Sequence, residues 1–278
     1  MAGVTAERDE WMRRTGPLYP GLVALCYLTA VPLPRGLEPT EDDVVRSAVW
    51  FPLVGGIAGT VLYSLAQLLR AANLATAVAA IFIVVAGVAG TRAMRELGVG
   101  KTADRLGGLR ANVSASEITA HGAIAIVAAL ALRAGALIST DVGVWFAALV
   151  ISQASAYWAM LLALKLTHQA DGESGSRQGR TESALTGKVS WTTAAVAGGI
   201  LAGAAVMLDV WHTGGYSFVA VLATALLACF VGWFFQRRTD GATRPTLASA
   251  ALICEIAALL VFAAAHPASE SPWIGPPT

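Results

Sequence analysis

Long apolar stretches separated by short polar segments dominate the pattern of this chain. Seven stretches approach 20 residues, the length that an α-helix needs to cross the hydrocarbon core of a bilayer. None of them shows the strict alternation of a membrane strand. The pattern therefore predicts an all-α, polytopic integral membrane protein with about seven transmembrane helices. The predicted spans are Ser47–Leu69, Leu74–Thr91, Ile118–Ile138, Gly143–Leu166, Trp191–Leu208, Ser217–Gln236 and Leu247–Ala265.

The ends of the chain differ from its apolar centre. An eighth apolar stretch, Leu18–Pro34, is shorter and ends in Pro32-Leu33-Pro34, so we expect a re-entrant or interfacial segment rather than a full span. Residues 1–17 form a charged segment, expected on the cytoplasmic side, and the proline-rich residues 267–278 predict a disordered tail. A single membrane-embedded helical domain is expected over residues 18–266.

Composition supports a membrane protein. Hydrophobic residues make up 56% of the chain and charged residues 13%, with a mean hydropathy of +0.63. Soluble domains carry roughly a quarter charged residues, so a soluble domain and a disordered chain are both excluded. The net charge of +1 gives no reason to expect nucleic acid. The three cysteines lie in apolar runs without metal-ligand spacing, which excludes a disulfide scaffold.

Basic residues follow a regular alternation between loops. Every second loop holds several lysines or arginines, whereas the other loops and the C-terminal tail hold only Arg70. The positive-inside rule places the basic loops in the cytoplasm.

Two charged residues, Arg133 and Glu255, lie deep inside predicted spans, whereas Lys165 lies at the cytoplasmic end of one. A charge at the bilayer centre costs at least about 2.5 kcal/mol on insertion scales, so a functional role is the first expectation. The alternative for Arg133 is that its side chain reaches the outer interface. Glu255 is expected either to face a polar site open to the cytoplasm or to be protonated.

Chemistry on a water-soluble, phosphate-bearing substrate is expected in the long cytoplasmic loops. In the predicted loop Arg92–Glu117, Gly100-Lys101-Thr102 is similar to the end of a phosphate-binding loop, but Arg95 replaces the first glycine of that motif. The predicted loop Arg237–Pro245 combines arginines with a polar turn, which is typical of an anion-binding site. The candidate phosphate-binding residues are Lys101, Thr102, Arg110, Arg237, Arg238, Thr243 and Arg244.

Four stretches agree in order and spacing with one known family: Tyr27–Pro34, Ser47–Gly56, Leu97–Gly108 and Arg237–Thr246. On these residues the chain resembles the cobalamin synthases, the adenosylcobinamide-GDP ribazoletransferases. The resemblance runs from about Leu22 to Ala265.

The resemblance implies a specific reaction. The family joins α-ribazole, or its phosphate, to adenosylcobinamide-GDP and releases GMP, with Mg²⁺ as cofactor, in the last steps of cobalamin biosynthesis. It implies a multi-pass protein of a bacterial or archaeal inner membrane. The expected partners are a corrinoid nucleotide, an α-ribazole-type small molecule and the lipid bilayer. The oligomeric state stays open.

The resemblance also assigns site residues. The three aspartates of the family's acidic motif correspond to Leu97, Lys101 and Asp104, so only the third is kept. Asp104 and Glu255 are therefore the expected catalytic residues. Asp104 is also the expected metal ligand, with Glu96 or Asp240 recruited beside it.

The loss of two acidic positions leaves alternatives open. One is a catalytically inactive relative that binds a corrinoid or a protein partner. Another, from a different class, is a small transporter or a membrane scaffold.

Overall fold

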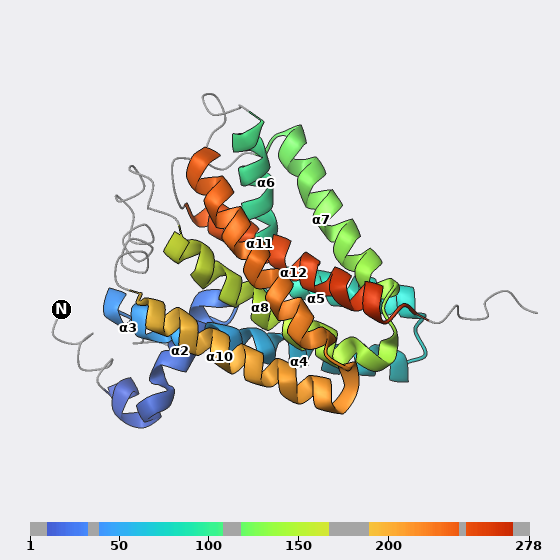
Figure 1. Cartoon of the computed structure of the whole chain (residues 1–278), viewed down its shortest axis with the longest axis horizontal. Coiled ribbons are helices and arrows are strands. Elements are labelled where there is room, and N and C mark those ends of the chain that lie inside the picture. The colour runs from blue at the N-terminus through green and yellow to red at the C-terminus, as the bar shows by residue number, and fades with distance from the viewer. Residues whose placement is uncertain (1–9, 33–38, 108–117, 167–188, 239–242, 269–278) are drawn as a thin grey trace, which may run out of the picture.

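The computed structural model describes residues 10–32, 39–107, 118–166, 189–238 and 243–268. The secondary-structure elements named within these ranges are all helices (Figure 1). Six of the helices are long and apolar enough to cross a membrane, which confirms six of the predicted spans. The helices of eight or more residues are α2 (Tyr19–Leu28), α4 (Phe51–Ala71), α5 (Thr76–Gly90), α6 (Met94–Leu106), α7 (Ala120–Ile138), α8 (Trp145–Leu166), α10 (Trp191–Leu208), α11 (Tyr216–Arg238) and α12 (Arg244–Ala265).

Helix α8 lies at the centre of the bundle, between α4 and α12 (Figure 1). Glycines on α4 make its closest approach to α8 possible. A Cβ atom added at Gly55 would lie 2.5 Å from the Gln153 carbonyl oxygen, and one added at Gly59 would lie 2.5 Å from that of Leu149. Small residues of this kind let the backbones of membrane helices touch.

Large apolar side chains cover the outside of the bundle. Val61, Leu68, Ile124, Val127 and Leu226 are each more than 60% exposed. Apolar surface of this extent would be unstable in water, whereas lipid tails solvate it. The exposed faces therefore agree with the membrane assignment.

The predicted span Leu74–Thr91 differs most from its expectation. Helix α5 has only 15 residues, about 22 Å at 1.5 Å per residue, which is short of the roughly 30 Å hydrocarbon core. The chain then bends by 84° into α6. Only the two helices taken together are long and apolar enough to count as one membrane span. At the bend, Arg92 and Ala93 adopt the left-handed conformation, with φ of 53° and 56°.

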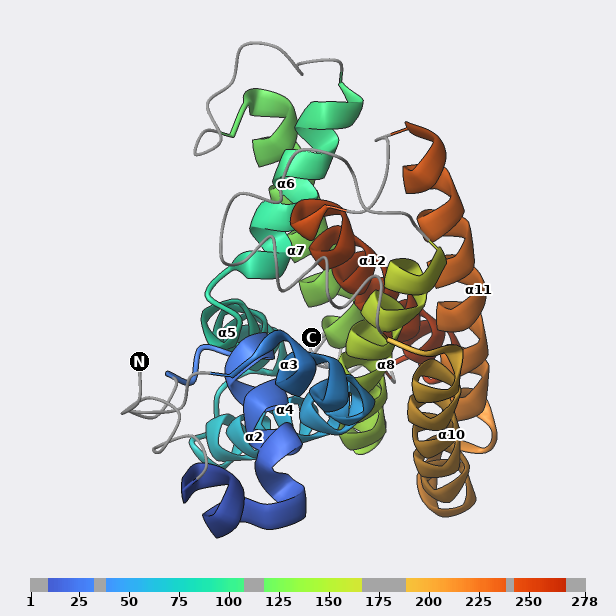
Figure 2. The same cartoon turned by 90° about the vertical axis from the view of Figure 1, so that its left-hand side faces the viewer.

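The expectation that Arg92–Glu117 forms a solvated loop is wrong for its first part, because residues 94–106 form α6 inside the bundle. Helix α6 packs against both α12 and α7, and Figure 2 shows the three helices together. Two glycines make this position possible. A Cβ atom at Gly98 would lie 2.6 Å from that of Ala248 on α12, and one at Gly100 would lie 2.9 Å from Ile126 Cδ1 on α7.

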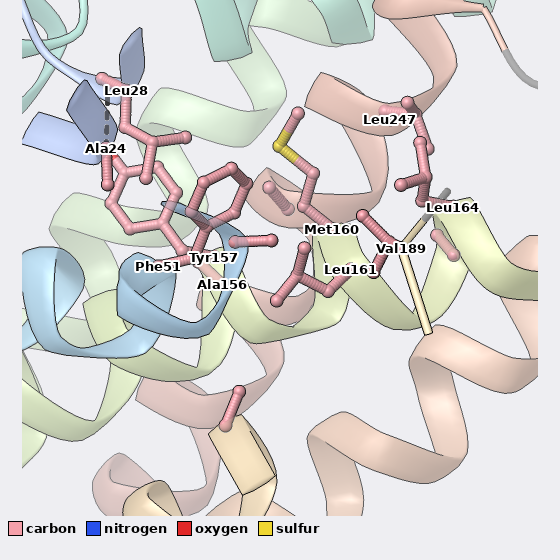
Figure 3. Close-up of a cluster of buried hydrophobic side chains, with 14 of the residues drawn as sticks. Ala24, Leu28, Phe51, Ala156, Tyr157, Met160, Leu161, Leu164, Val189 and Leu247 are labelled. Carbon is pink, nitrogen blue, oxygen red and sulfur yellow. Dashed lines mark hydrogen bonds between the residues drawn. The ribbon is translucent and has the colours of Figure 1, made fainter. Parts of the chain in front are cut away.

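The N-terminal stretch Leu18–Pro34 contains the ten-residue helix α2, too short to span a bilayer. It packs on α4 and α8: Figure 3 shows Tyr157 beside Leu28 and Phe51, with the Tyr157 hydroxyl donating to the Leu28 carbonyl at 3.2 Å. The chain after α2 then reaches the α5–α6 bend. Ala30 N–H donates to the Gly90 carbonyl at 2.7 Å, and Arg92 Nη2 donates to the Ala30 carbonyl at 2.8 Å.

Candidate active site

Four buried charged side chains meet at the inner side of α6, and we call them the charge cluster: Arg95, Glu96, Arg133 and Glu255. Each is at most 3% exposed. Arg95 Nη1 lies 2.6 Å from Glu255 Oε2. Arg133 on α7 bridges both carboxylates, with Nη1 at 2.8 Å from Glu96 Oε1 and Nη2 at 2.8 Å from Glu255 Oε1. Two arginines and two glutamates make the charge cluster neutral overall.

Helices α5 and α8 complete the surroundings of the charge cluster. Gln153 Nε2 donates to Glu255 Oε1 at 2.7 Å, and the Arg95 guanidinium lies 5.5 Å from the centre of the Tyr157 ring. Gly87 on α5 makes room for Arg133, because a Cβ atom there would lie 2.9 Å from Arg133 Nη2. The charge cluster thus joins side chains from α6, α7 and α12, and α8 adds Gln153 and Tyr157 beside it.

These contacts correct the expectations for the two intramembrane charges. Arg133 does not reach an interface, because its guanidinium is enclosed and paired with two carboxylates. Glu255 is enclosed as well, so it faces no open polar site. Both of its oxygens accept hydrogen bonds, from Arg95 Nη1 and from Gln153 Nε2.

Asp104, the acidic motif residue that the chain keeps, caps the start of α7. Its carboxylate accepts hydrogen bonds from Thr119 N–H at 3.0 Å, from Gly122 N–H at 2.7 Å and from the Thr119 hydroxyl. The first N–H groups of a helix have no partner within the helix, and a negative charge there also interacts favourably with the helix dipole. Asp104 therefore secures the C-terminal part of α6 to α7.

The carboxylates near α6 do not fit a magnesium site made by Asp104 with Glu96. They lie eight positions apart on one helix, about 12 Å along its axis. Asp104 is already bonded to the start of α7, and Glu96 is paired with Arg133. Within the ranges that the structure describes, no group of three His, Cys, Asp or Glu residues could hold a metal ion. Asp240 lies outside those ranges, so the magnesium implied by the resemblance stays a prediction.

The outward side of α6 carries the other two motif positions. Leu97 is 42% exposed and Lys101 is partly exposed. Together with Asp104 they follow the i, i+4, i+7 spacing that lines one side of a helix. This side is distinct from the charge cluster, which lies at the buried face of the same helix.

The candidate phosphate-binding residues divide into two groups. Thr243 lies near the end of α6, where Arg105 Nη1 donates to its hydroxyl at 2.8 Å, and Thr102 on α6 is buried. Arg237 and Arg238 end α11, and the Arg237 guanidinium lies 4.8 Å from the centre of the Trp233 ring. Arg110 lies outside the described residues, and Arg244 begins α12.

Sequence reasoning missed four residues that the structure brings to this region: Arg95, Arg105, Gln153 and Tyr157. Arg95 and Arg105 lay in a stretch that was expected to be solvated, where isolated charges carry no signal. Gln153 was a single polar residue in an apolar span, and polar residues within spans often bond between helices. That feature was the one available signal.

We expect Asp104→Ala to destabilise the protein by about 1–2 kcal/mol, because the start of α7 loses its cap. Asp104→Asn keeps one acceptor oxygen and should lose about half as much. Unfolding monitored by tryptophan fluorescence measures both. Leu106→Ala, at an exposed position of the same helix, is the matched control and should change stability little. Equal stability of Asp104→Ala and Leu106→Ala would contradict the capping role.

Comparison with known proteins identifies the family. A family model described as cobalamin-5-phosphate synthase matches residues 21–263. The adenosylcobinamide-GDP ribazoletransferases of Brucella ovis and Brucella canis are each 30% identical over 263 residues, covering 90% of this chain and 98% of each relative. No solved structure matches the chain. The protein therefore belongs to the cobalamin-5-phosphate synthase family.

Proposed function

We propose that this chain joins α-ribazole, or its phosphate, to adenosylcobinamide-GDP and releases GMP. The observation that carries the proposal is the extent of the match, which covers 98% of ribazoletransferases from two Brucella species. The match to the family model, over residues 21–263, contains all of α6 and all but the last two residues of α12. The reaction is a displacement at phosphorus, in which an oxygen of the ribazole substrate attacks the cobinamide phosphate and GMP leaves.

The residues at the end of α6 support binding of an anionic substrate there. Lys101 and Arg105 lie one turn apart, and Arg105 contacts Thr243 at the start of α12. Cationic side chains beside a helix N-terminus stabilise phosphate, both in the ground state and while charge moves to the leaving group. We assign to Lys101 the role of holding the pyrophosphate of adenosylcobinamide-GDP.

We further propose that this end of α6 faces the cytoplasm of a bacterial or archaeal cell, across its inner membrane. The contact between Arg105 and Thr243 supports a common side for the end of α6 and the start of α12. Both adjoin the basic loops, which the positive-inside rule places in the cytoplasm. Water-soluble substrates would then reach the site directly.

A turnover assay tests the proposal. Purified protein in lipid receives adenosylcobinamide-GDP and α-ribazole phosphate, with Mg²⁺ or with EDTA, and chromatography separates the corrinoid product and GMP. We expect both products in equal amounts. The Brucella ovis relative in parallel tubes shows that the assay works. No product from this chain, with an active relative, would contradict the proposal and favour a catalytically inactive protein that binds the corrinoid nucleotide.

Lys101→Met should lower kcat/KM by about ten- to a hundredfold, the loss typical of one hydrogen bond to a charged group. The fall should appear with adenosylcobinamide-GDP as the varied substrate. Leu106→Ala, on the same helix, serves as the control and should keep wild-type kinetics. Wild-type kinetics in Lys101→Met would show that Lys101 does not hold the pyrophosphate.

A further inference from the structure

We propose that the charge cluster is the positioning device of α6, with Arg133 as its central positioning residue. The device holds the helix that carries the motif positions in one fixed place and rotation. It acts through α6, and its ion pairs are made by Arg95, Glu96, Arg133 and Glu255 rather than by Leu97 or Lys101 on the outward side. The effect on catalysis rests on the proposed function, whereas the placement of α6 can be measured without it.

The bend before α6 shows why this helix needs to be held. Arg92 and Ala93 are consecutive left-handed residues, and neither is glycine. The left-handed conformation is unfavourable for each L-residue, because it brings Cβ too close to the following carbonyl oxygen. Such a conformation persists only where the surrounding structure fixes it. Left to itself, the chain at this bend would relax and carry α6 with it.

Contacts on both sides of the bend oppose that relaxation. Before α6, Ala30 is bonded to Gly90 and to Arg92 by the hydrogen bonds described above. Directly after the bend, the second and third residues of α6, Arg95 and Glu96, enter the charge cluster. The start of α6 is thereby fixed to α12 through Glu255 and to α7 through Arg133.

The geometry of Arg133 makes it the centre of the device. Its two terminal nitrogens contact different carboxylates, one on α6 and one on α12. The planar guanidinium fixes the directions of both bonds, so a sliding or rotation of α6 breaks at least one of them. Apolar packing would tolerate such a movement better. Buried ionic groups often contribute more to a unique arrangement than to stability, and this is the role we assign here.

Several buried polar atoms of the charge cluster already lack a hydrogen-bond partner. Among the described residues, Glu96 Oε2, Arg95 Nε and Arg133 Nε have no hydrogen-bond partner. Loss of one further bond therefore leaves a buried charge poorly compensated, which is costly in a low-dielectric interior. The arrangement is consequently sensitive to removal of any single member.

Cysteine labelling can follow the position of α6 directly. In a chain whose three native cysteines are alanine, Thr102→Cys reports on the buried face of α6, and Leu97→Cys reports on its outward side. We expect Leu97→Cys to react quickly with a water-soluble maleimide and Thr102→Cys slowly. Adding Arg133→Met should raise the labelling rate of Thr102→Cys by about tenfold or more, because α6 opens locally. With Arg133→Lys, the labelling rate of Thr102→Cys should lie between the rates with Arg133 and with Arg133→Met, since one ammonium group cannot hold both carboxylates.

Two controls separate positioning from general loosening. Gln153→Leu removes a bond to Glu255 from α8 and leaves both α6 ion pairs in place, so labelling of Thr102→Cys should stay slow. Leu201→Ala opens a cavity in α10 and lowers stability away from α6, and it should not speed labelling either. If Arg133→Met does not fold, labelling in the Glu96→Gln variant tests the proposal instead. That variant removes the ion pair between Glu96 and Arg133 and keeps both ion pairs of Glu255.

The outcomes are distinct. Fast labelling in Arg133→Met or Glu96→Gln, with slow labelling in both controls, supports the proposal. Slow labelling in folded Arg133→Met and Glu96→Gln would overturn it. In the turnover assay, the same variants should lower kcat in the order of their labelling rates. If the wild-type protein shows no turnover, the proposed function is wrong. The labelling rates then still test whether the charge cluster positions α6.

Discussion

Replacing Glu255 with leucine is expected to destabilise the folded protein by about 3–5 kcal/mol. Glu255 pairs with both Arg95 and Arg133, and each guanidinium is enclosed in the bundle. The substitution leaves two positive charges against the single carboxylate of Glu96. Uncompensated buried charge is among the few causes of a loss this large from a single substitution. Unfolding in detergent, followed by tryptophan fluorescence to which the buried Trp145 contributes, measures the loss.

A graded series gives this prediction its controls. Gln153→Leu removes one hydrogen bond to the same carboxylate and should cost about 1.5–3 kcal/mol, because that bond is to a charged group. Replacing all four members of the charge cluster with apolar residues of similar volume should restore much of the stability, since no charge stays unpaired. If Glu255→Leu proves as stable as the wild type, the ion pairs described here do not persist in the membrane.

Adding one methyl group at Gly59 is expected to destabilise the protein by about 1–3 kcal/mol, and more when Gly55 is changed as well. In Gly59→Ala the new Cβ atom would lie 2.5 Å from the Leu149 carbonyl oxygen and 2.6 Å from Val150 Cα. These are backbone atoms, so no side-chain rotation relieves the clash. Helices α4 and α8 must separate, and α8 is the most buried of the spanning helices.

Gly56→Ala on the same helix is the matched control. Its added Cβ atom would have only Val150 Cγ1 within 4 Å, at 3.9 Å, which is an ordinary contact. Alanine is a better helix residue than glycine, so this substitution should be neutral or stabilising by up to about 1 kcal/mol. Similar losses at positions 56 and 59 would show that the close approach of α4 and α8 is not what limits stability.

Much of the fold could be predicted from the sequence, because six spanning helices keep enough apolar residues in a row to be recognised one by one. Helix α6 could not be recognised in this way. Its charged residues are typical of a solvated loop, and the partners that neutralise them lie 37 and 160 positions away, at Arg133 and Glu255. Pattern analysis over a short window does not include such partners. The predicted span Leu74–Thr91 also included Leu74 and Ala75 before the short helix α5 and Thr91 after it, so its length exceeded that of the helix.

The candidate site divides in the same way. The sequence identified Asp104, Glu96 and Glu255 as acidic residues that need an explanation, and the structure brings Glu96 and Glu255 together around Arg133. The sequence could not show what each carboxylate contacts. Asp104 caps a neighbouring helix that begins 16 residues later, and this contact depends on how α6 packs against α7. The sequence shows where a carboxylate lies along the chain, whereas the group that it contacts depends on the completed fold.

The pairing of the charge cluster has a consequence for the biosynthesis of the protein. A chain emerges from the ribosome N-terminus first, so Glu96 and Arg133 both leave it before Glu255 is made. These two residues can enter the bilayer as a neutral pair, which reduces the cost of inserting a lone arginine in α7. Arg95 has to wait for the last helix. A nascent chain that stops before α12 therefore has one carboxylate for two arginines, and the pairing is complete only when the last helix is in place.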